Sequence, residues 1–465
     1  MEKTSSQASL RPLGPVRLFF KAPGERRRPP READVVVHLF EPDAPGLPIF
    51  HNFREFWPLR DELAGSVKSF LCFSLGVWAA DKLVCRASWP DAWTREIVLE
   101  FPSSSDLLKA GQRLAHLAGF LTGDKWDLRP REAPLPLNFG ASWPQFGKPT
   151  AVVLFSGGLD SLVGAIDLLE EGHRLVLVSH YDYGQLAATQ QTLAAALAQN
   201  YGRDRLYHLQ IRVQLEGPEL SLRSRSLLYL ALALTAAGAF PTTLPVTVPE
   251  NGWISLNPPL TLNRLGSYST RTTHPYFIRE LAGLWQDLGL GFGVANPGQD
   301  LTKGEMLARC RNLRLLRELF PLSVSCARPV VGRWRRQPAG ACGYCYPCLM
   351  RRVALHRMGW DRGEHYRVDV LGQASALRHR VQGQDLRSLC LALKTWQENP
   401  GAILARLWWG EYKPGETEGF SAPWRLLTTG FQEIANWLYG GGEAAIRNFL
   451  GNDGLDALPA SYPSD

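Results

Sequence analysis

The sequence predicts an α/β protein built on a parallel sheet. Between residues 151 and 240, apolar segments of strand length alternate with helical segments, and a Gly-Gly turn joins the first strand to the first helix. This alternation is typical of βαβ units, whose strands pair in parallel. The pattern of apolar segments differs on either side of this region, which predicts an N-terminal α+β region at residues 1–145 and a C-terminal helical region at residues 361–465.

The composition is that of a globular protein with a mild basic excess. The chain has 465 residues, of which 45% are hydrophobic and 20% are charged, enough for two or three domains. The net charge of +7 favours anionic partners such as nucleotides and leaves direct nucleic-acid binding open. Residues 1–15 lack the apolar core of a signal peptide, and the longest apolar stretch, residues 226–240, is too short to span a bilayer. We therefore expect a cytoplasmic protein without a membrane partner.

The first region, residues 1–145, combines strands with helices. Strand-length segments with β-branched or aromatic content lie at residues 16–21, 35–40 and 96–101. Helical apolar patterns lie at residues 56–84 and 105–117. The basic loop at residues 25–32 contains paired prolines, and we interpret it as a solvated hairpin tip between the first two strands rather than a phosphate-binding arm. Residues 129–148 are rich in Pro, Trp and Gly, which predicts a linker.

The second and third regions, residues 146–360 and 361–465, differ in their elements. Strands at residues 151–155, 174–180 and 206–213 alternate with helices at residues 160–171, 186–199 and 224–238. Further helices are predicted at residues 385–399, 402–409, 424–439 and 442–450. We expect the two flanking regions to dock partners, but we expect most of the tryptophans Trp396, Trp408, Trp409 and Trp437 to fill a core.

Residues 156–161, SGGLDS, carry the strongest functional signal. They directly follow an apolar strand and directly precede a helix. Paired glycines let the backbone approach a ligand with its N–H groups turned inward, and the helix N-terminus attracts phosphate. Asp160 can cap that helix or hold a metal bound to the phosphates. A plain strand–turn–helix joint is the alternative, but strand, loop and helix all agree with a phosphate-binding loop.

The hexamer resembles the SGGxDS signature of the PP-loop ATP pyrophosphatases, which have an adenine nucleotide alpha-hydrolase-like fold. The resemblance implies that the loop holds the pyrophosphate of ATP, that Mg²⁺ accompanies the phosphates, and that a carboxylate is activated as an adenylate. The loop residues implied to bind ATP are Ser156, Gly157, Gly158, Leu159, Asp160 and Ser161. Asp160 is also implied to be catalytic.

Three later motifs are similar to those of QueC enzymes within that group. Residues 182–185 match the QueC motif DYGQ, which implies ATP contacts for Asp182, Tyr183, Gly184 and Gln185. Arg225 opens a long apolar helix, as an Arg does in QueC; it opposes the helix dipole, so either an anionic partner or a surface position explains it. Lys303, in the sequence LTKGE, resembles the Lys of the QueC motif KAE and is implied to be a point charge on the phosphates. A solvated Lys in the first helical turn is the alternative.

Four of the eight cysteines form a cluster in the sequence. Cys342, Cys345 and Cys348 have the spacing C-x2-C-x2-C, with Cys326 upstream. Four thiolates suit a tetrahedral Zn²⁺. An iron–sulfur cluster is the rival, but Arg352 stands where bacterial ferredoxins have their next cysteine. QueC enzymes have the same arrangement followed by a basic residue, and the closed ligand set predicts a structural zinc.

The resemblance covers residues 150–360, and the extensions have no counterpart in QueC. A larger relative, QatC of the bacterial Qat anti-phage defence system, is similar in size and layout, which implies other Qat proteins as partners. QueC recognises its deazaguanine substrate with a stretch that reads roughly SGYPDCR, which is not found here. Residues 250–277 stand in its place, and their polar part, residues 266–275, is either a pocket for a purine-like ligand or a surface loop.

These motifs leave three functions open. The first is a QueC-like enzyme that adenylates a 7-deazaguanine-type carboxylate and passes it to an amine, either ammonia or a partner protein. The second is a tRNA- or nucleobase-modifying PP-loop thiolase, which is disfavoured because no cysteine lies between Cys85 and Cys310. The third is a non-catalytic ATP-binding subunit of a defence complex. Pyrophosphate release would separate the first function from the third.

Overall fold

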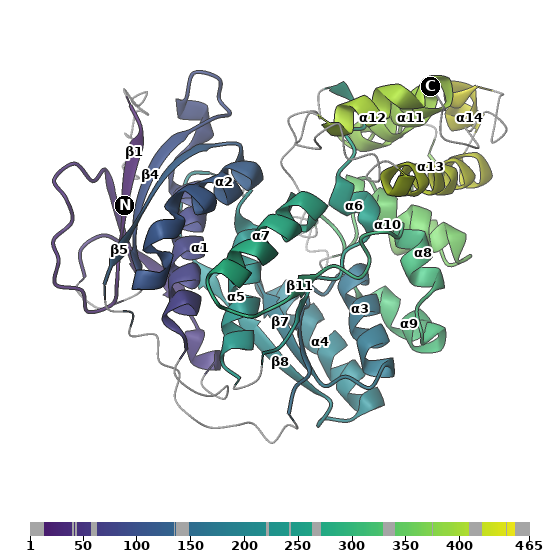
Figure 1. Cartoon of the computed structure of the whole chain (residues 1–465). Helices are drawn as coiled ribbons and strands as arrows, with labels where there is room; N and C mark the ends of the chain where they lie inside the picture. The colour runs from purple at the N-terminus through teal and green to yellow at the C-terminus, as the bar shows by residue number, and fades with distance from the viewer. Residues whose placement is uncertain are drawn as a thin grey trace, which may run out of the picture.

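The computed structural model describes most of the chain as two sheets, one mostly and one entirely parallel, and a group of helices. The described residues are 14–39, 41, 44–56, 63–133, 135, 148–219, 223–240, 243–262, 271–328, 340–373, 375–408, 421–442 and 444–451. The predicted parallel α/β core and helical C-terminal region are confirmed (Figure 1). Among the helices of the described residues, none combines the length and the apolar character needed to cross a membrane.

The first sheet belongs mainly to the N-terminal region. Its strand order is β5-β4-β1-β2-β3-β9. The strands are β1 (Val16–Lys21), β2 (Val35–Leu39), β3 (Leu47–His51), β4 (Glu96–Ser103), β5 (Lys125–Glu132) and β9 (Val213–Gln214). Strand β9 comes from the central region and pairs with β3 in antiparallel orientation, so the two regions share this sheet.

The hairpin expected between the first two strands is wrong, because β1 and β2 pair in parallel. Residues 22–34 cross over between them, and a crossover takes about a dozen residues. The loop is also anchored rather than fully solvated. Glu25 is buried and accepts a hydrogen bond of 2.5 Å from Arg131 of β5, which also bonds the carbonyl oxygen of Phe20.

The second sheet is the core of the central region. Its strand order is β11-β10-β6-β7-β8, and all its pairs are parallel. The strands are β6 (Ala151–Leu154), β7 (Leu175–His180), β8 (Leu206–Ile211), β10 (Val246–Thr247) and β11 (Val294–Ala295). Every residue of β7 is buried, as expected for a central parallel strand covered on both faces.

Helices separate the two sheets and cover the far face of the second one (Figure 1). Between the sheets lie α1 (Gly65–Leu83) and α2 (Gly111–Thr122) on one side and α5 (Arg225–Gly238) and α7 (Pro275–Asp287) on the other. The far face carries α3 (Leu159–Glu170) and α4 (Gly184–Tyr201). Phe70 of α1 meets Trp285 of α7 edge to face at 5.9 Å within one continuous apolar cluster, so the two sheets share a core.

A buried ion network strengthens this junction. Asp81 of α1 accepts hydrogen bonds from Arg86 at 2.7 Å and Arg95 at 2.6 Å. Its second oxygen accepts from the backbone N–H and the hydroxyl of Ser224, each at 2.9 Å. Ser224 is the residue before α5, so a carboxylate of the N-terminal region caps a helix of the central region.

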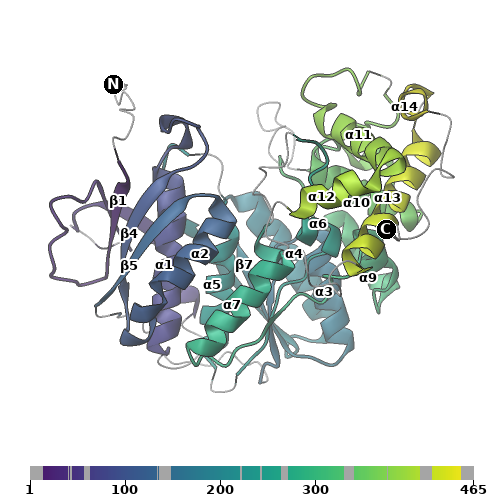
Figure 2. The same cartoon turned by 45° about the horizontal axis from the view of Figure 1, so that its top comes forward.

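The remaining helices gather at the end of the molecule opposite the first sheet (Figure 2). They are α6 (Gly252–Leu256), α8 (Lys303–Ala308), α9 (Leu313–Leu319), α10 (Tyr346–Arg357), α11 (Gln384–Glu398), α12 (Pro400–Trp408), α13 (Ser421–Gly441) and α14 (Ala444–Leu450). Trp396 and Trp437 are fully buried among them, which confirms their core role; the side chain of Trp408 and the whole of Trp409 lie outside the described part.

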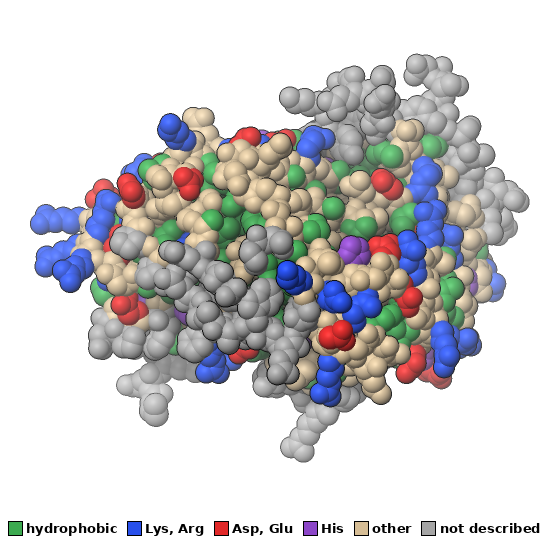
Figure 3. Space-filling model, turned by 60° about the horizontal axis from the view of Figure 1, so that its bottom comes forward, with side chains coloured by type: hydrophobic (Ala, Val, Ile, Leu, Met, Phe, Trp, Pro, Cys, Tyr) green, Lys and Arg blue, Asp and Glu red, His purple; other side chains and the backbone are tan. Residues whose placement is uncertain are grey.

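The excess of basic side chains is mixed with acidic ones on the surface seen in Figure 3. On this face, Lys and Arg side chains are interspersed with Asp and Glu side chains. Interspersed charge is typical of a solvated surface. The net charge therefore does not favour a nucleic acid over a small anionic ligand on this face.

Candidate functional site

A cavity of about 370 Å³ lies where the carboxyl ends of the second sheet meet α8 and α10. Strands β7 and β8 lie on one side of β6, and β10 and β11 lie on the other, so the strand order changes direction between β6 and β10. Open parallel sheets bind ligands at such a switch point. Ser156, which follows β6, and Glu250, which follows β10, both line the cavity.

The SGGLDS loop forms the middle of the cavity wall. Gly157 has a φ of +79°, and a Cβ there would lie 3.1 Å from the side chain of Gln190, so the turn requires glycine. The backbone N–H of Gly158 donates to the hydroxyl of Ser156 at 3.2 Å, and that of Leu159 donates to the hydroxyl of Ser325 at 3.2 Å. Each of these two N–H groups donates to a serine hydroxyl. A phosphate oxygen is suited to replace that hydroxyl as the acceptor.

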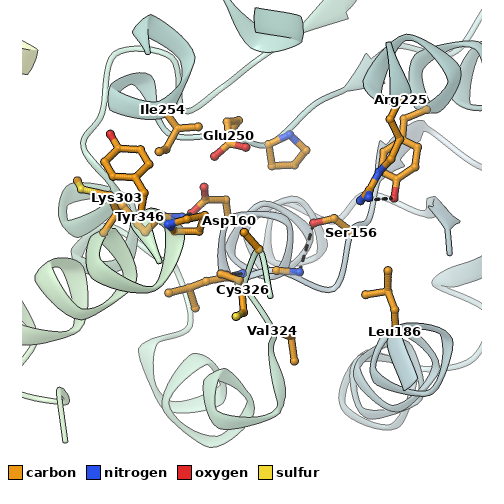
Figure 4. A pocket seen from close by; sticks show the side chains of 18 of the residues that line it. Ser156, Asp160, Leu186, Arg225, Glu250, Ile254, Lys303, Val324, Cys326 and Tyr346 are labelled. Atoms are coloured by element: carbon orange, nitrogen blue, oxygen red, sulfur yellow. Dashed lines mark hydrogen bonds and ion pairs between the residues drawn. The ribbon is translucent and has the colours of Figure 1, made fainter. Parts of the chain in front are cut away.

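Asp160, Glu250 and Lys303 gather at one end of the cavity, as Figure 4 shows. The Lys303 ammonium lies 2.5 Å from Asp160 Oδ1. Asn251 Nδ2 donates to Asp160 Oδ2 at 2.8 Å and to Glu250 Oε1 at 3.0 Å, so one amide bridges the two carboxyl groups. Asp160 is 6% exposed and Lys303 is 7% exposed, so this pair is shielded from water.

The two carboxyl groups differ in protonation. Burial raises the pKa of Asp160, but the charge of Lys303 and the hydrogen bonds from Glu250, Lys303 and Asn251 outweigh it and lower that pKa to about 2. Burial, and next the neighbouring charge of Asp160, raise the pKa of Glu250 well above its usual value. We therefore assign a charged Asp160 beside a protonated Glu250.

Arg225 lies at the other end of the cavity (Figure 4). It begins α5, and its guanidinium lies 3.0 Å from the carboxylate of Asp182. The anionic partner expected at this helix start is thus present within the protein itself. Tyr183 and Tyr229 line the same end, and the Tyr229 hydroxyl donates to the carbonyl oxygen of His180 at 2.9 Å.

The predicted ATP-binding residues divide into two groups. The residues among them that line the cavity are Ser156, Gly158, Leu159, Asp160 and Tyr183. Within the described part of the chain, the others lie outside the cavity lining: Gly157, Ser161, Asp182, Gly184 and Gln185. Of these, Ser161 donates its hydroxyl to Gly158 O at 3.0 Å, Asp182 holds Arg225, and Gly184 begins α4. They support the residues that line the cavity.

The four predicted cysteine ligands come together. The sulfur atoms of Cys326, Cys342, Cys345 and Cys348 all lie within 4.8 Å of one another. Cys326 and Cys345 are 3.9 Å apart, as are Cys342 and Cys348. A tetrahedral zinc with Zn–S bonds of about 2.3 Å separates its sulfurs by about 3.8 Å, so the cluster fits Zn²⁺. Gly343 has a φ of +86°, and a Cβ there would lie 2.1 Å from Val368 O, so glycine is required inside the motif.

The two ends of the stretch at residues 250–277 contact different parts of the molecule. Glu250 and Ile254 line the cavity. Arg271 instead donates to Phe120 O at 3.0 Å, and the ring of His274 packs against that of Phe120 at 5.5 Å, so both contact α2 of the N-terminal region. The expected pocket residues 266–270 lie outside the described residues.

Several cavity residues were not predicted from the sequence. Ser325, Cys326 and Tyr346 line the cavity, and so does Glu250, which was predicted only as the first residue of the stretch 250–277 and without a role of its own. Cys326 was predicted only as a metal ligand, yet it also belongs to the cavity wall. Glu250 follows the buried strand β10, but a strand of two residues gives almost no periodic signal.

Comparison with known proteins shows which family the first part of the cavity-forming region resembles. The family model described as "Queuosine biosynthesis protein QueC" matches residues 150–236. The central region is QueC-like. The match includes the SGGLDS loop, DYGQ and Arg225. The residues among them that line the cavity are Ser156, Gly158, Leu159, Asp160, Tyr183 and Arg225.

Similar proteins carry one common description, 7-cyano-7-deazaguanine synthase. The one from Parasynechococcus marenigrum is 27% identical over 240 residues, which cover 49% of this chain and 98% of that protein. The one from Novosphingobium aromaticivorans is 29% identical over 241 residues, with coverages of 47% and 94%. The one from Synechococcus is 26% identical over 226 residues, with coverages of 45% and 94%. The QueC-like part therefore matches these synthases over almost their full length and accounts for less than half of this chain.

Proposed function

We propose that this protein is an ATP-dependent enzyme that adenylates the carboxylate of a 7-deazaguanine-type substrate. The observation that carries the proposal is the SGGLDS loop at a parallel-sheet switch point, with the Asp160–Lys303 pair in the same cavity. The QueC family match and the synthases described above support the same chemistry. The altered stretch at residues 250–277 makes the identity of the base the part of the proposal that most needs its own test.

The proposed reaction has two steps. A carboxylate oxygen attacks the α-phosphorus of ATP, the bond to the oxygen bridging to the β-phosphate breaks, and pyrophosphate leaves with that electron pair. An amine nitrogen then attacks the acyl carbon of the adenylate; AMP leaves, and the nitrogen loses a proton. Lys303 and Arg225 lie at opposite ends of the cavity with the loop between them, where two cations can neutralise charge along a phosphate chain. The N–H groups of Gly158 and Leu159 orient the phosphates. Mg²⁺ carried on the phosphates would supply further charge neutralisation.

The zinc proposed for the four cysteines would have a structural role. It would hold residues 326 and 342–348 together, and Cys326 contributes to the cavity wall. Four thiolates leave no open coordination position, so the ion would not bind substrate. A thiolase needs a reactive cysteine near the loop. Among the described residues, the cysteine that lines the cavity is Cys326, and it is one of the four proposed zinc ligands. A zinc-bound Cys326 would not serve as that reactive cysteine, which counts against a thiolase.

The acceptor amine is either ammonia or an amino group of a partner protein, and we propose the partner. Nearly half of the chain matches compact synthases, and the remainder adds surface that those synthases do not match. The similarity in size and layout to QatC extends the proposal to anti-phage defence, with other Qat proteins as the partners. This extension rests on that similarity alone.

The test of the ATP chemistry is pyrophosphate release with purified protein, Mg²⁺-ATP and the 7-carboxylate of 7-deazaguanine. Release that depends on the carboxylate, with AMP formed in equal amount, supports the proposal. Ser156→Ala is the matched variant: it removes only one hydroxyl from the loop, and it is expected to lose most of the pyrophosphate release. ATP binding without pyrophosphate release from any carboxylate tested would instead identify a non-catalytic nucleotide-binding subunit.

The test of the acceptor is intact mass spectrometry of candidate partner proteins after co-expression. An added mass on a partner with the wild-type chain, absent with Asp160→Asn, supports transfer to a protein. Unmodified partners together with free amide or nitrile would show that ammonia is the acceptor.

A further inference from the structure

The C-terminal helix α13 contacts the start of α8, the helix that carries Lys303. Glu433 of α13 is 7% exposed, and its carboxylate accepts a hydrogen bond of 2.6 Å from the hydroxyl of Thr302. We propose that Glu433 is a positioning residue, which sets the start of α8 and thereby the place of the Lys303 ammonium against Asp160. The inference rests on the proposed function in treating Lys303 as a cation for the nucleotide phosphates.

Thr302 is the residue through which Glu433 acts. Its hydroxyl accepts from the backbone N–H of Glu305 at 3.0 Å, and the Glu305 carboxylate accepts from the backbone N–H of Thr302 at 2.9 Å. This reciprocal pair is a capping box, which fixes where α8 begins. Lys303 is the next residue, so a shift of Thr302 moves the backbone from which the lysine side chain extends.

Gly304 shows how closely α13 approaches. A Cβ at this position would lie 2.5 Å from Glu433 Oε1 and 2.8 Å from the stem of Arg357, distances that require something to move. The QueC motif that this segment resembles has Ala at the same place, and this chain has Gly. The position at which this chain differs from the motif, Gly304, is therefore the position that α13 approaches closely.

Two arginines complete the junction. Arg357 of α10 donates to Glu433 Oε1 at 2.6 Å, so the carboxylate is charge-paired and does not compete with Asp160 for Lys303. Arg425, also on α13, donates to Glu305 at 2.9 Å and to the carbonyl oxygen of Asp300. Helix α13 thus holds both residues of the capping box, Thr302 through Glu433 and Glu305 through Arg425.

The first experiment measures kcat and KM for ATP in pyrophosphate release. Glu433→Ala is expected to raise KM or lower kcat by about ten- to hundredfold, because small misplacements of charged groups have effects of this size. Glu433→Gln keeps an oxygen that accepts from Thr302 and is expected to recover most of the loss. Asn436→Ala, an exposed change on the same helix, is the matched control and is expected to match the wild type. Wild-type kinetics in Glu433→Ala would overturn the inference.

The second experiment uses Gly304. In the wild-type background, Gly304→Ala is expected to impair ATP use as Glu433→Ala does, because the new methyl group displaces the carboxylate. In the Glu433→Ala background the same change is expected to add little, because the carboxylate is gone and the Arg357 side chain, no longer bonded to it, can move away from the new methyl group. Fully additive effects on kcat/KM would contradict a shared route through Glu433.

A third measurement separates positioning from general stability and does not depend on the reaction. The coupling free energy between Asp160→Asn and Lys303→Met is measured by urea denaturation in the Glu433 and Glu433→Ala backgrounds. A positioning role predicts that the coupling falls in the alanine background. Lower stability with unchanged coupling would overturn the inference, whether or not the wild-type protein releases pyrophosphate. A wild type without pyrophosphate release would overturn only the proposed function.

Discussion

Two carboxyl groups beside one ammonium group dominate the chemistry of the cavity. With Asp160 charged and Glu250 protonated, the pair together with Lys303 is close to neutral, and this fits their burial. A nucleotide brings negative charge; Lys303 and Arg225 are each already paired with a carboxylate, so the phosphates would share these cations with Asp160 and Asp182 and would also meet the positive end of the loop dipole. Individual substitutions at this end of the cavity therefore change both charge and stability.

We expect Asp160→Asn and Ser156→Ala to abolish or strongly reduce pyrophosphate release in a folded protein. Ser156→Ala removes the acceptor of the Gly158 N–H, and Asp160→Asn removes the partner of Lys303. Asn is preferred to Ala at position 160 because truncation removes the side chain that pairs with the buried Lys303 ammonium, and breaking a buried pair typically costs about 3–5 kcal/mol. Circular dichroism checks the fold and a pyrophosphate assay checks activity; wild-type rates in Asp160→Asn would refute the loop assignment.

Glu250 is expected to make stability fall as pH rises. Its pKa is raised on folding, so above about pH 4.5 the folded state holds a proton that the unfolded state has lost. The free energy of unfolding then decreases by up to about 1.4 kcal/mol per pH unit until Glu250 ionises in the folded protein. Asp160 acts in the opposite direction: its contribution is present above its usual pKa and is lost as pH falls toward about 2.

Glu250→Gln has no such proton to bind, so its stability relative to the wild type should increase from pH 5 to pH 8. Urea denaturation of the nucleotide-free protein without added Mg²⁺ and without chelator, at four pH values, measures this difference. A difference that does not change with pH would mean that Glu250 is ionised throughout this range.

Among single residues, the sequence predicted those that belong to a motif or match a position of the QueC pattern, and it missed Ser325 and Tyr346, which do neither. Ser156, Gly158 and Asp160 were found because a loop, a strand and a helix agree over six residues. Ser325 and Tyr346 come to the cavity from two separate segments, and each is an ordinary residue in its local sequence; Glu250 was predicted only as the start of the stretch 250–277. Only the tertiary arrangement brings them to the loop.

Among the elements, the cysteine segment offers the most direct test. We expect one zinc per chain, bound by Cys326, Cys342, Cys345 and Cys348, and a lower free energy of unfolding when any of them is changed to Ser, because metal binding and folding are coupled. Elemental analysis and thermal denaturation with a chelator measure both. Buried Cys390, outside the cluster, is the control: its change to Ser should leave the metal content at one per chain. Iron in place of zinc would contradict the assignment.

Strands and helices were predictable where their pattern is long. The central strands β6, β7 and β8 and helices α3, α4 and α5 lie within a few residues of the predicted positions. Strand β5 was not predicted, and its second half, residues 129–132, overlaps the segment predicted as a linker: its apolar residues Trp126 and Leu128 alternate with charged ones and Pro130 interrupts them. It is an edge strand, where proline is tolerated. Strands β9, β10 and β11 are two residues long and leave no periodic signal.

Across the whole molecule, the N-terminal and central regions share one apolar core. We expect them to unfold in a single transition, and Phe70→Ala to lower the free energy of unfolding by about 3–5 kcal/mol, because Phe70 is fully buried against Trp285. Calorimetry with fluorescence checks this, with exposed Leu47→Ala as control. Two separate transitions, only one of them shifted by Phe70→Ala, would contradict a shared core.

The extensions could be delimited from the sequence, but their relation to the cavity could not. The boundaries near residues 145 and 360 stay predictions. The Asp81 cap on α5 and the Glu433 contact with α8 join residues that are 143 and 131 positions apart in the chain. Such pairs leave no trace in composition or periodicity, and so the regions expected only to dock partners also brace the two helices that carry Arg225 and Lys303.

The segment around Ser325 connects two binding events through one short piece of backbone. Val324 donates its N–H to Gly157 O at 2.9 Å, Ser325 accepts from Leu159, and Cys326 belongs to the sulfur cluster. An ion held by the sulfurs would therefore order one wall of the nucleotide loop, and linkage is reciprocal: whatever the ion adds to nucleotide affinity, the nucleotide adds to ion affinity. ATP should then slow the extraction of the metal by a chelator. The resistance of the protein to metal loss would therefore depend on how much of it has nucleotide bound.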